Sequence, residues 1–327
     1  MARKKHTVIG LGELLWDLFP SGRKLGGAPA NFAYITSLLG DYGIPASRVG
    51  QDHLGEEAIL RLTELGLPAS FIQDDADHAT GTVKVEVDDR GQPRFQIAES
   101  VAWDFLEWTP QWQILAEQAD AVCFGSLAQR SPRSRSSIRN FLQATRAEAV
   151  RVFDVNLRQN FYSAEILSDS MKIATIVKLN HEELPEIAEI LGLNKPGSNH
   201  FGSKHSPLNH LSVNPPPFNH EDEESSARLL LARYNLKLIC ITRGDRGSLL
   251  LTAGGRHEHP GVRVKVADTV GAGDAFTAAL VHEYLCRASL ESMNEVANRM
   301  GAWVASQVGA TPVLKPGGLE KTLAGIC

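Results

Sequence analysis

The sequence predicts an α/β fold with a mostly parallel β-sheet that is covered by helices on both faces. Short β-branched runs alternate along the chain with segments of helical periodicity, which is the pattern of successive strand–helix–strand units. Polar residues and glycines follow several of the strand runs directly. With 327 residues, of which 43% are hydrophobic, the chain is long enough to bury one substantial core. We therefore expect a single domain over residues 1–327.

The predicted strands are short apolar runs, and the predicted helices carry apolar residues at helical spacing. The strands are expected near Thr7–Leu11, Ala121–Phe124, Val150–Val155, Thr175–Leu179 and Leu238–Thr242. The helices are expected near Ala28–Leu39, Glu56–Leu65, Ser136–Ala147 and Ala227–Tyr234.

Polar or glycine residues come soon after four of these strands. They are Glu13, Asn156, Asn180 and Gly244. Because ligands bind beyond the carboxyl ends of the strands in such sheets, we expect these residues to lie along one edge and to form a single cleft.

A glycine-rich turn leads into an apolar helical run between Asp268 and Leu280. Gly271 and Gly273 lack the side chains that would keep a phosphate away from the backbone, so the amides of residues 271–274, including Ala272, can point at one oxyanion. Asp274 can then accept the proton of an alcohol that attacks the bound phosphate. On its own, the pattern is equally compatible with an ordinary helix start that carries an acid in its first turn.

Two further segments narrow the choice. An apolar strand ends at Gly10-Leu-Gly-Glu13, with Asp17 four residues on, and Gly26-Gly-Ala-Pro-Ala-Asn31 follows. Together with the glycine-rich turn, these motifs resemble the PfkB (ribokinase-like) family of carbohydrate kinases, and the second motif looks most like a fructokinase. Supporting segments lie in the family's order at 125–130, 154–158, 178–183 and 242–248.

The resemblance implies a ribokinase-like three-layer sandwich with a small β lid formed from about 16–27 and 79–100. Alternating β-branched and polar residues around an acidic, glycine-containing turn predict a hairpin over Thr80–Glu99 independently. As a lid, this hairpin would place Phe95 over a sugar face and would pair with a second subunit, so a homodimer through the lid is expected. The alternative is an ordinary surface hairpin.

By resemblance, Asp17 and Asn31 contact the sugar, and Gly26 and Gly27 allow its ring to approach closely. Glu13 either contacts the sugar or only caps the following turn. In the segment 154–158, Asn156 and Arg158 are expected to line the cleft, although Arg158 can equally be a structural ion-pair partner.

By the same resemblance, a further group of residues is expected to bind the nucleotide and its cations. Asn180 and Glu183 resemble the family's motif for organising magnesium, with Glu183 acting through water, but the same spacing is a common helix-capping pattern. Asp268 and Val270 lie where relatives can bind potassium. The residues predicted to contact the nucleotide are Asn180, Thr242, Gly244, Gly247 and Asn298.

Residues 194–226 break the α/β pattern. The segment contains Pro215-Pro-Pro217, four histidines and the acidic run Glu221-Asp-Glu-Glu224, with little apolar periodicity. We expect a mobile insertion there. The histidine spacings of five, five and ten do not match metal-ligand spacing, so no structural metal is predicted.

The composition argues against nucleic acid and membranes as partners. The net charge of −5 and the pI near 6.1 provide no field that would attract nucleic acid or an anionic membrane. The apolar run after the basic N-terminus is too short for a signal peptide or a membrane span, so a cytoplasmic location is expected. The four cysteines show no Cys-x-x-Cys spacing, and none is predicted to be catalytic.

The predicted function is an ATP-dependent sugar kinase that phosphorylates a primary hydroxyl, with fructose as the first candidate substrate and with ATP, Mg²⁺ and, in some relatives, K⁺ as cofactors. A kinase of the same family for 2-keto-3-deoxygluconate, ribose or a nucleoside remains an alternative, as does a sugar-binding regulator without chemistry. The chain has no Walker-type phosphate loop, and Leu15 stands where a dinucleotide-binding motif would need its third glycine.

Overall fold

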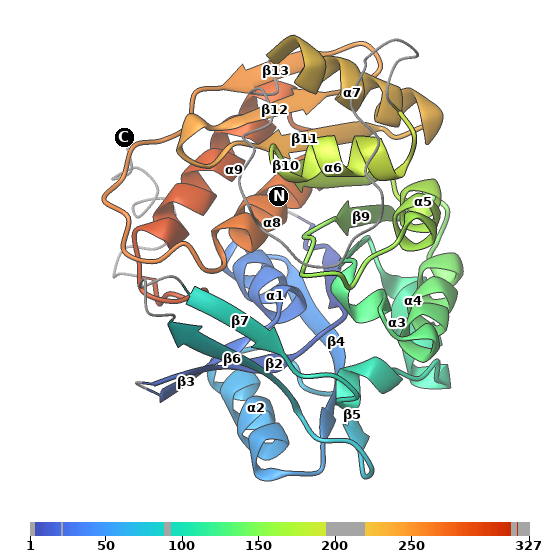
Figure 1. Ribbon diagram of the computed structural model, residues 1–327, viewed down its shortest axis with the longest axis vertical. Coiled ribbons are helices and arrows are strands. Elements are labelled where there is room, and N and C mark those ends of the chain that lie inside the picture. Colours follow the sequence, from blue (N-terminus) through green and yellow to red (C-terminus); the bar gives the residue numbers. More distant parts are fainter. Residues whose placement is uncertain (1–3, 21, 88–92, 194–219, 315–318, 320–327) are drawn as a thin grey trace.

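The computed structural model describes residues 4–20, 22–87, 93–193, 220–314 and 319. A nine-stranded sheet crosses the molecule in the order β13-β12-β11-β10-β9-β8-β1-β4-β5 (Figure 1). From β11 to β5 the strands pair in parallel, and β12 and β13 add an antiparallel edge. The strands are β1 (Thr7–Leu11), β4 (Tyr42–Gly50), β5 (Ile72–Asp75), β8 (Ala121–Phe124), β9 (Val150–Asp154), β10 (Ile176–Asn180), β11 (Leu238–Thr242), β12 (Ser248–Leu251) and β13 (Arg256–His259).

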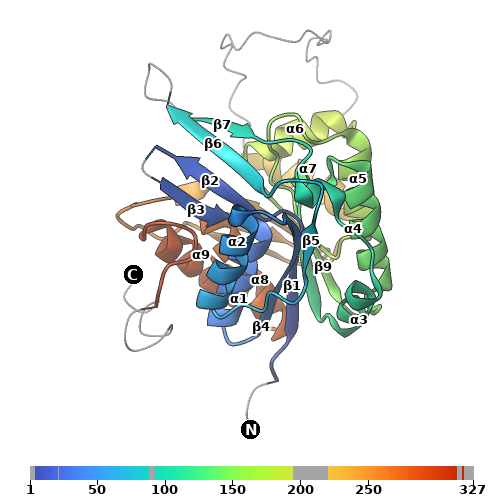
Figure 2. The same ribbon diagram turned by 90° about the horizontal axis from the view of Figure 1, so that it is seen from below.

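Helices cover both faces of this sheet, which confirms the predicted three-layer architecture (Figure 2). Successive strand residues point to opposite faces, so Val122 packs with one helical layer and Cys123 with the other. One layer contains α3 (Pro110–Gln118), α4 (Pro132–Ala144), α5 (Ala164–Ile173), α6 (Glu183–Ile190) and α7 (His220–Arg233). The other contains α1 (Ala28–Leu38), α2 (His53–Glu64), α8 (Ala272–Leu285) and α9 (Leu290–Ala305).

The sequence-based strands and helices match observed elements to within a few residues, except that α7 begins seven residues before its predicted start at Ala227. Strand β4 has no clear strand signal, because Gly43 and Pro45 interrupt its apolar pattern. Its glycine serves packing, since a Cβ on Gly43 would lie 1.9 Å from the carbonyl oxygen of Ala33 in α1. A Cβ on Gly10 in β1 would lie 2.1 Å from the carbonyl oxygen of Pro29. The two glycines thus let α1, with Asn31, lie close against the sheet.

A separate four-stranded sheet, in the order β3-β2-β6-β7, occupies the residues predicted for the lid (Figure 1). Strand β2 pairs in parallel with β6, whereas β3 and β7 pair antiparallel on the outside. Its strands are β2 (Leu15–Phe19), β3 (Gly22–Gly26), β6 (Gly81–Val87) and β7 (Pro93–Ile97). The turn of the predicted hairpin lies outside the described residues.

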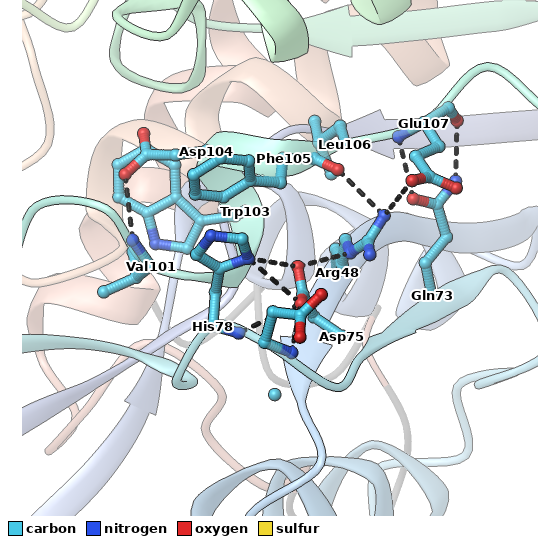
Figure 3. Close-up of polar contacts among 12 residues, drawn as sticks. Arg48, Gln73, Asp75, His78, Val101, Trp103, Asp104, Phe105, Leu106 and Glu107 are labelled. Atoms are coloured by element: carbon cyan, nitrogen blue, oxygen red, sulfur yellow. Dashed lines mark hydrogen bonds and ion pairs between the residues drawn. The ribbon is translucent and has the colours of Figure 1, made fainter.

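A polar network fixes the base from which this small sheet rises (Figure 3). Asp75, at the end of β5, pairs with Arg48 Nε at 2.8 Å and with His78 Nδ1 at 3.1 Å. Arg48 Nη1 also donates to the carbonyl oxygen of Phe105 at 2.9 Å, and the His78 ring stacks on the Phe105 ring. The network joins β4 and β5 to the short helix η1 (Ala102–Phe105), so β6 and β7 leave the core at a defined position.

A second buried ion pair lies near η1. Arg130 forms two hydrogen bonds to Asp104, at 2.8 and 2.7 Å, between the rings of Trp103 and Phe161. Its side chain is 7% exposed, and that of Asp104 is 5% exposed. We expect Arg130→Leu to lower the free energy of unfolding by about 3–5 kcal/mol, because Asp104 would stay buried without its partner. Denaturant unfolding measures this change.

The matched control is Arg139→Leu, which breaks the partly exposed ion pair with Asp169 on α5. Its loss is expected to stay below about 1 kcal/mol, because water solvates both groups and screens their attraction. Equal losses in the two variants would contradict the importance of the buried pair.

The predicted insertion over 194–226 needs a correction at its end. Residues 220–226 form the first turns of α7, and residues 194–219 lie outside the described residues. Acidic side chains are favoured in the first turn of a helix, and Glu223 is buried beside Arg243. Ala227 and Leu230 then bury the apolar face of α7 against the core. No helix among the described residues is long and apolar enough to cross a membrane.

Candidate active site

A cavity opens at the carboxyl ends of β1, β8 and β9. Four of the residues that line it are polar groups of interest for chemistry: Glu13, Asp154, Asn156 and Asp274. The predicted cleft therefore brings Glu13 and Asn156 together with the acid of the glycine-rich turn. The remaining lining residues are Ala28, Pro29, Phe32, Cys123, Phe124, Gly125, Ser126 and Leu127.

Asp274 lies in the first turn of α8, which begins at Ala272 after Gly271. Asn31 Nδ2 donates a hydrogen bond of 2.8 Å to Asp274 Oδ2, so α1 orients the carboxylate. Burial raises the pKa of Asp274 to about 6, and the charge of Asp154 acts in the same direction. The carboxylate is thus fixed in position and is a stronger base than an exposed aspartate.

Gly271 takes a left-handed conformation at the N-cap of α8, with φ 79°. A Cβ there would lie 2.4 Å from the Cβ of Ala310, so a larger residue does not fit. Of the four amides predicted to face one oxyanion, that of Ala272 donates to the carbonyl oxygen of Thr269 at 3.2 Å in a tight turn, and its contact with an anion stays a prediction. The amides of Gly273 and Asp274 belong to the first turn of α8, where N–H groups have no intrahelical partner.

The structure shows where the Glu13 side chain lies, and its contact with the sugar stays a prediction. Its side chain lines the cavity, and its carboxylate also interacts with the backbone amide of Ala28 at the start of α1. Burial is the largest cause that raises the pKa of Glu13, to about 7, and the nearby Asp274 adds to it. The two acids therefore influence each other's protonation.

Asp17, on β2 of the small sheet, faces the same group of charges. Burial raises the pKa of Asp17 to about 6, while the positive charges of Arg158 and Lys24 act against that rise. Arg158 also acts on the carboxyl groups of Glu13 and Asp274. One exposed guanidinium thus lies within electrostatic reach of three acids, which connects the small sheet to the main cleft.

The glycines predicted to admit the sugar also have structural reasons. A Cβ on Gly26 would lie 2.5 Å from Asp17 Oδ2, and a Cβ on Gly27 would lie 2.5 Å from the carbonyl oxygen of Glu13. Phe95 pairs with Val85 between β7 and β6, and its side chain lies outside the described residues.

Asn180 and Glu183 form a reciprocal capping box at the start of α6. Asn180 Oδ1 accepts the amide of Glu183 at 2.8 Å, and Glu183 Oε2 accepts the amide of Asn180 at 2.8 Å. Glu183 Oε1 accepts the amide of Leu157 at 2.8 Å. Glu183 therefore joins the loop after β9 to the end of β10.

The turn predicted for the nucleotide follows β11. The carbonyl oxygen of Thr242 accepts the amide of His181 at 2.9 Å, which places this turn beside Asn180. Gly244 has φ 62° and open space around its Cα, whereas a Cβ on Gly247 would collide with the carbonyl oxygen of His259 at 2.0 Å. Packing thus gives Gly247 a structural reason, Gly244 is exposed, and the nucleotide contacts of both stay predictions.

Asn298 and Asp268 already have protein partners. Asn298 is buried in α9 and its amide nitrogen donates to Ser248 Oγ at 2.8 Å, so only its carbonyl side remains for the predicted nucleotide contact. Asp268 accepts the amides of Val270 and Gly309 at 3.1 Å each. The ammonium of Lys24 lies 3.4 Å from Asp268 Oδ2. Potassium at Asp268 and Val270 stays a prediction.

Comparison with known proteins decides the family. Residues 21–316 match the model of the pfkB family of carbohydrate kinases. The chain belongs to this family. It is 29% identical to the fructokinase of Escherichia coli over 83% of this chain and 82% of that protein. A solved sugar kinase from Pyrococcus horikoshii shares the fold at a TM-score of 0.77 and 25% identity, covering 98% of this chain and 99% of that one.

A fructokinase from Vibrio cholerae, solved with fructose, ADP and calcium, is similar in fold as well. Its TM-score is 0.75 at 23% identity, and 98% of each chain is covered. The family match establishes that the chain is a carbohydrate kinase, and these solved structures show the same fold, as the sequence motifs predicted.

Magnesium is expected in a pfkB kinase, and the residues present fit a hydrated ion better than a directly ligated one. The described residues contain no group of three or more His, Cys, Asp or Glu side chains that could hold a metal. Both Glu183 oxygens accept backbone amides, and each keeps a lone pair for a water molecule. Because Mg²⁺ retains several waters and binds substrate phosphates, Glu183 is suited to an indirect contact.

Sequence reasoning missed two charged residues of this pfkB kinase. Asp154 lines the cavity, and Lys178 pairs with it at 3.1 Å. Asp154 and Lys178 are the first residues of two segments that support the family resemblance, 154–158 and 178–183. Each also lies inside a predicted strand, and the sequence alone assigned it no role in the site. Charged residues inside otherwise apolar strand runs were the signal that could have identified them.

Proposed function

We propose that this carbohydrate kinase transfers the γ-phosphate of ATP to a primary hydroxyl of a small neutral sugar, with fructose as the first candidate. The observation that carries the proposal is the orientation of Asp274 by Asn31 inside a cavity at the start of α8. A carboxylate fixed beside the N-terminus of a helix can accept the hydroxyl proton while the helix amides bind the phosphate.

In the proposed reaction, Asp274 deprotonates the sugar hydroxyl as that oxygen attacks the γ-phosphorus in line. The amides of Gly273 and Asp274, with the positive end of α8, stabilise charge on the transferring oxygens. Magnesium, when bound with ATP, neutralises charge on the phosphates. The small sheet with Asp17 would bind sugar hydroxyls and keep water away from the phosphate.

The charges of the cavity support a neutral substrate over a sugar acid. Glu13, Asp17 and Asp274 are all acids, and Arg158 is the cation that acts on all three. A carboxylate such as that of 2-keto-3-deoxygluconate would meet more negative than positive charge there. Hydroxyl groups instead donate hydrogen bonds to carboxylates.

The test is ADP release with ATP and Mg²⁺ across fructose, ribose, 2-keto-3-deoxygluconate and adenosine, with and without K⁺. Selective turnover of fructose is expected. Preference for 2-keto-3-deoxygluconate would contradict the neutral-sugar assignment while leaving the kinase mechanism in place. Sugar binding without ADP release from any substrate would favour a regulator and contradict the proposed function.

The pH dependence follows from the raised carboxyl pKa values. Because the base must be ionised, and the pKa of Asp274 is about 6 beside Glu13 at about 7, kcat/KM is expected to fall as the pH drops below about 7. Glu13→Gln should leave this decline in place, because Glu13 has the higher pKa and is mostly uncharged in the pH range where Asp274 titrates. Initial rates between pH 5 and 8.5 measure both profiles, and a wild-type profile that is flat down to pH 5 would contradict the assignment.

A further inference from the structure

A buried ion pair lies directly below the glycine-rich turn, and the proposed mechanism does not use it. Lys178 on β10 and Asp154 on β9 are opposite each other in the sheet register. Lys178 Nζ lies 3.1 and 3.2 Å from the two carboxylate oxygens, and both side chains are at most 10% exposed. A buried pair adds little net stability compared with apolar residues of the same size, so stability alone does not account for it.

The pair is connected to the turn through one threonine. Thr277 lies one helical turn after Gly273 in α8, and its Oγ1 lies 2.8 Å from Asp154 Oδ2. The same oxygen lies 2.9 Å from the carbonyl oxygen of Gly273. A Cβ on Gly273 would lie 3.2 Å from Lys178 Nζ, so the ammonium packs directly against the turn. The contact between Thr277 and Asp154, which are 123 positions apart in the sequence, thus holds the start of α8 against the end of β9.

The pair also contributes to the charge that Asp274 experiences. The charge of Asp154 is the second-largest cause of the raised pKa of Asp274, after burial, and Lys178 acts in the opposite direction. Removing the charge of Asp154 should therefore make Asp274 more acidic. The titratable groups that face this cluster are Glu13 after β1, Cys123 on β8, Asp154 on β9, Arg158 after β9, Lys178 on β10, Glu183 on α6, Cys240 on β11 and Asp274 on α8.

We propose that Asp154 and Thr277 are positioning residues for phosphoryl transfer, which hold the Gly273–Asp274 end of α8 on the carboxyl end of β9, with Lys178 as the buried countercharge. This inference rests on the proposed function, in which Asp274 is the base. Neither residue needs to touch the sugar or the nucleotide. Each acts on the reaction through the position of the turn, and Asp154 acts through its charge as well.

Two variants separate position from charge. Thr277→Val removes the hydroxyl but keeps the side-chain shape and every charge. It should lower kcat about three- to tenfold, leave the KM for sugar within about twofold, and leave the pH profile in place. Asp154→Asn removes the charge, so it should lower kcat and also move the acidic decline of kcat/KM by about one pH unit to lower pH.

The matched control is Asp41→Asn. Asp41 is another buried carboxylate, and it contacts His282 at the other end of α8 at 2.7 Å. This variant should lose stability, measured as Tm, without a change in kcat or in the pH profile. The comparison shows whether turnover depends on any buried carboxylate that contacts α8, or only on Asp154 beside the turn.

The measured kcat, pH profile and Tm of these variants show whether the two residues act on the reaction. If Asp154→Asn and Thr277→Val lower Tm but keep the wild-type kcat and pH profile, their role is only structural and the proposal is overturned. If Asp154→Asn does not fold, an unchanged kcat in Thr277→Val alone overturns it. The proposed function fails separately, when Asp274→Asn remains active.

Discussion

Asp274→Asn is expected to lower kcat by about 10³-fold while the affinity for sugar changes less than about threefold. Positioned general bases contribute roughly 10²–10⁴ to the rate, and asparagine cannot accept the hydroxyl proton. Its side chain has the same shape, and its carbonyl oxygen can still accept the hydrogen bond that Asn31 donates to Asp274. The loss should therefore appear in turnover rather than in binding.

Steady-state rates of ADP release and calorimetric titration with fructose separate these two effects. Asp41→Asn serves again as the control. It neutralises a buried carboxylate that contacts His282 in the same helix, and Asp41 does not line the cavity. A kcat within tenfold of the wild type would show that another group accepts the proton.

Gly271→Ala is expected to lower kcat/KM for ATP by at least about tenfold. The residue has φ 79°, and an added Cβ would lie 2.7 Å from the Cα of Ala310 and 2.4 Å from its Cβ. Since backbone cannot move aside as a flexible side chain can, the turn must shift away from the position that binds the phosphate. Misplacement of reacting groups by about 1 Å costs roughly 10²-fold in rate.

Gly66→Ala is the matched control for this prediction. Gly66 has a similar φ of 73°, but no atom lies within 4 Å of an added Cβ. It therefore imposes the same left-handed strain, of about 1 kcal/mol, without the collision. Both variants should lose comparable stability from strain, and only Gly271→Ala should lose activity. Equal activities would show that the glycine is needed for folding alone.

The local patterns of the sequence predicted much of the site. The strand before Glu13 and the turn before Asp274 could be predicted because both depend on residues that are close in sequence. Glycines indicate the turns, and the spacing of apolar residues indicates a strand or a helix. The hairpin of β6 and β7 was predicted from its alternating pattern, whereas the rest of the small sheet was predicted from the family resemblance. Helix α7 extended into the predicted insertion because Glu223 has a partner, Arg243, that is distant in sequence.

What the sequence by itself determined is the α/β architecture, through its hydrophobic periodicity, and the pfkB family, through the resemblance of its motifs to that family, because periodicity and short motifs are local properties of the chain. The tertiary structure alone decided which amides and carboxylates are already engaged. Glu183 accepts the amide of Leu157, and Lys178 pairs with Asp154, only because β9 and β10 lie side by side in the folded sheet. Such pairings depend on strand register between distant segments, which no local pattern specifies.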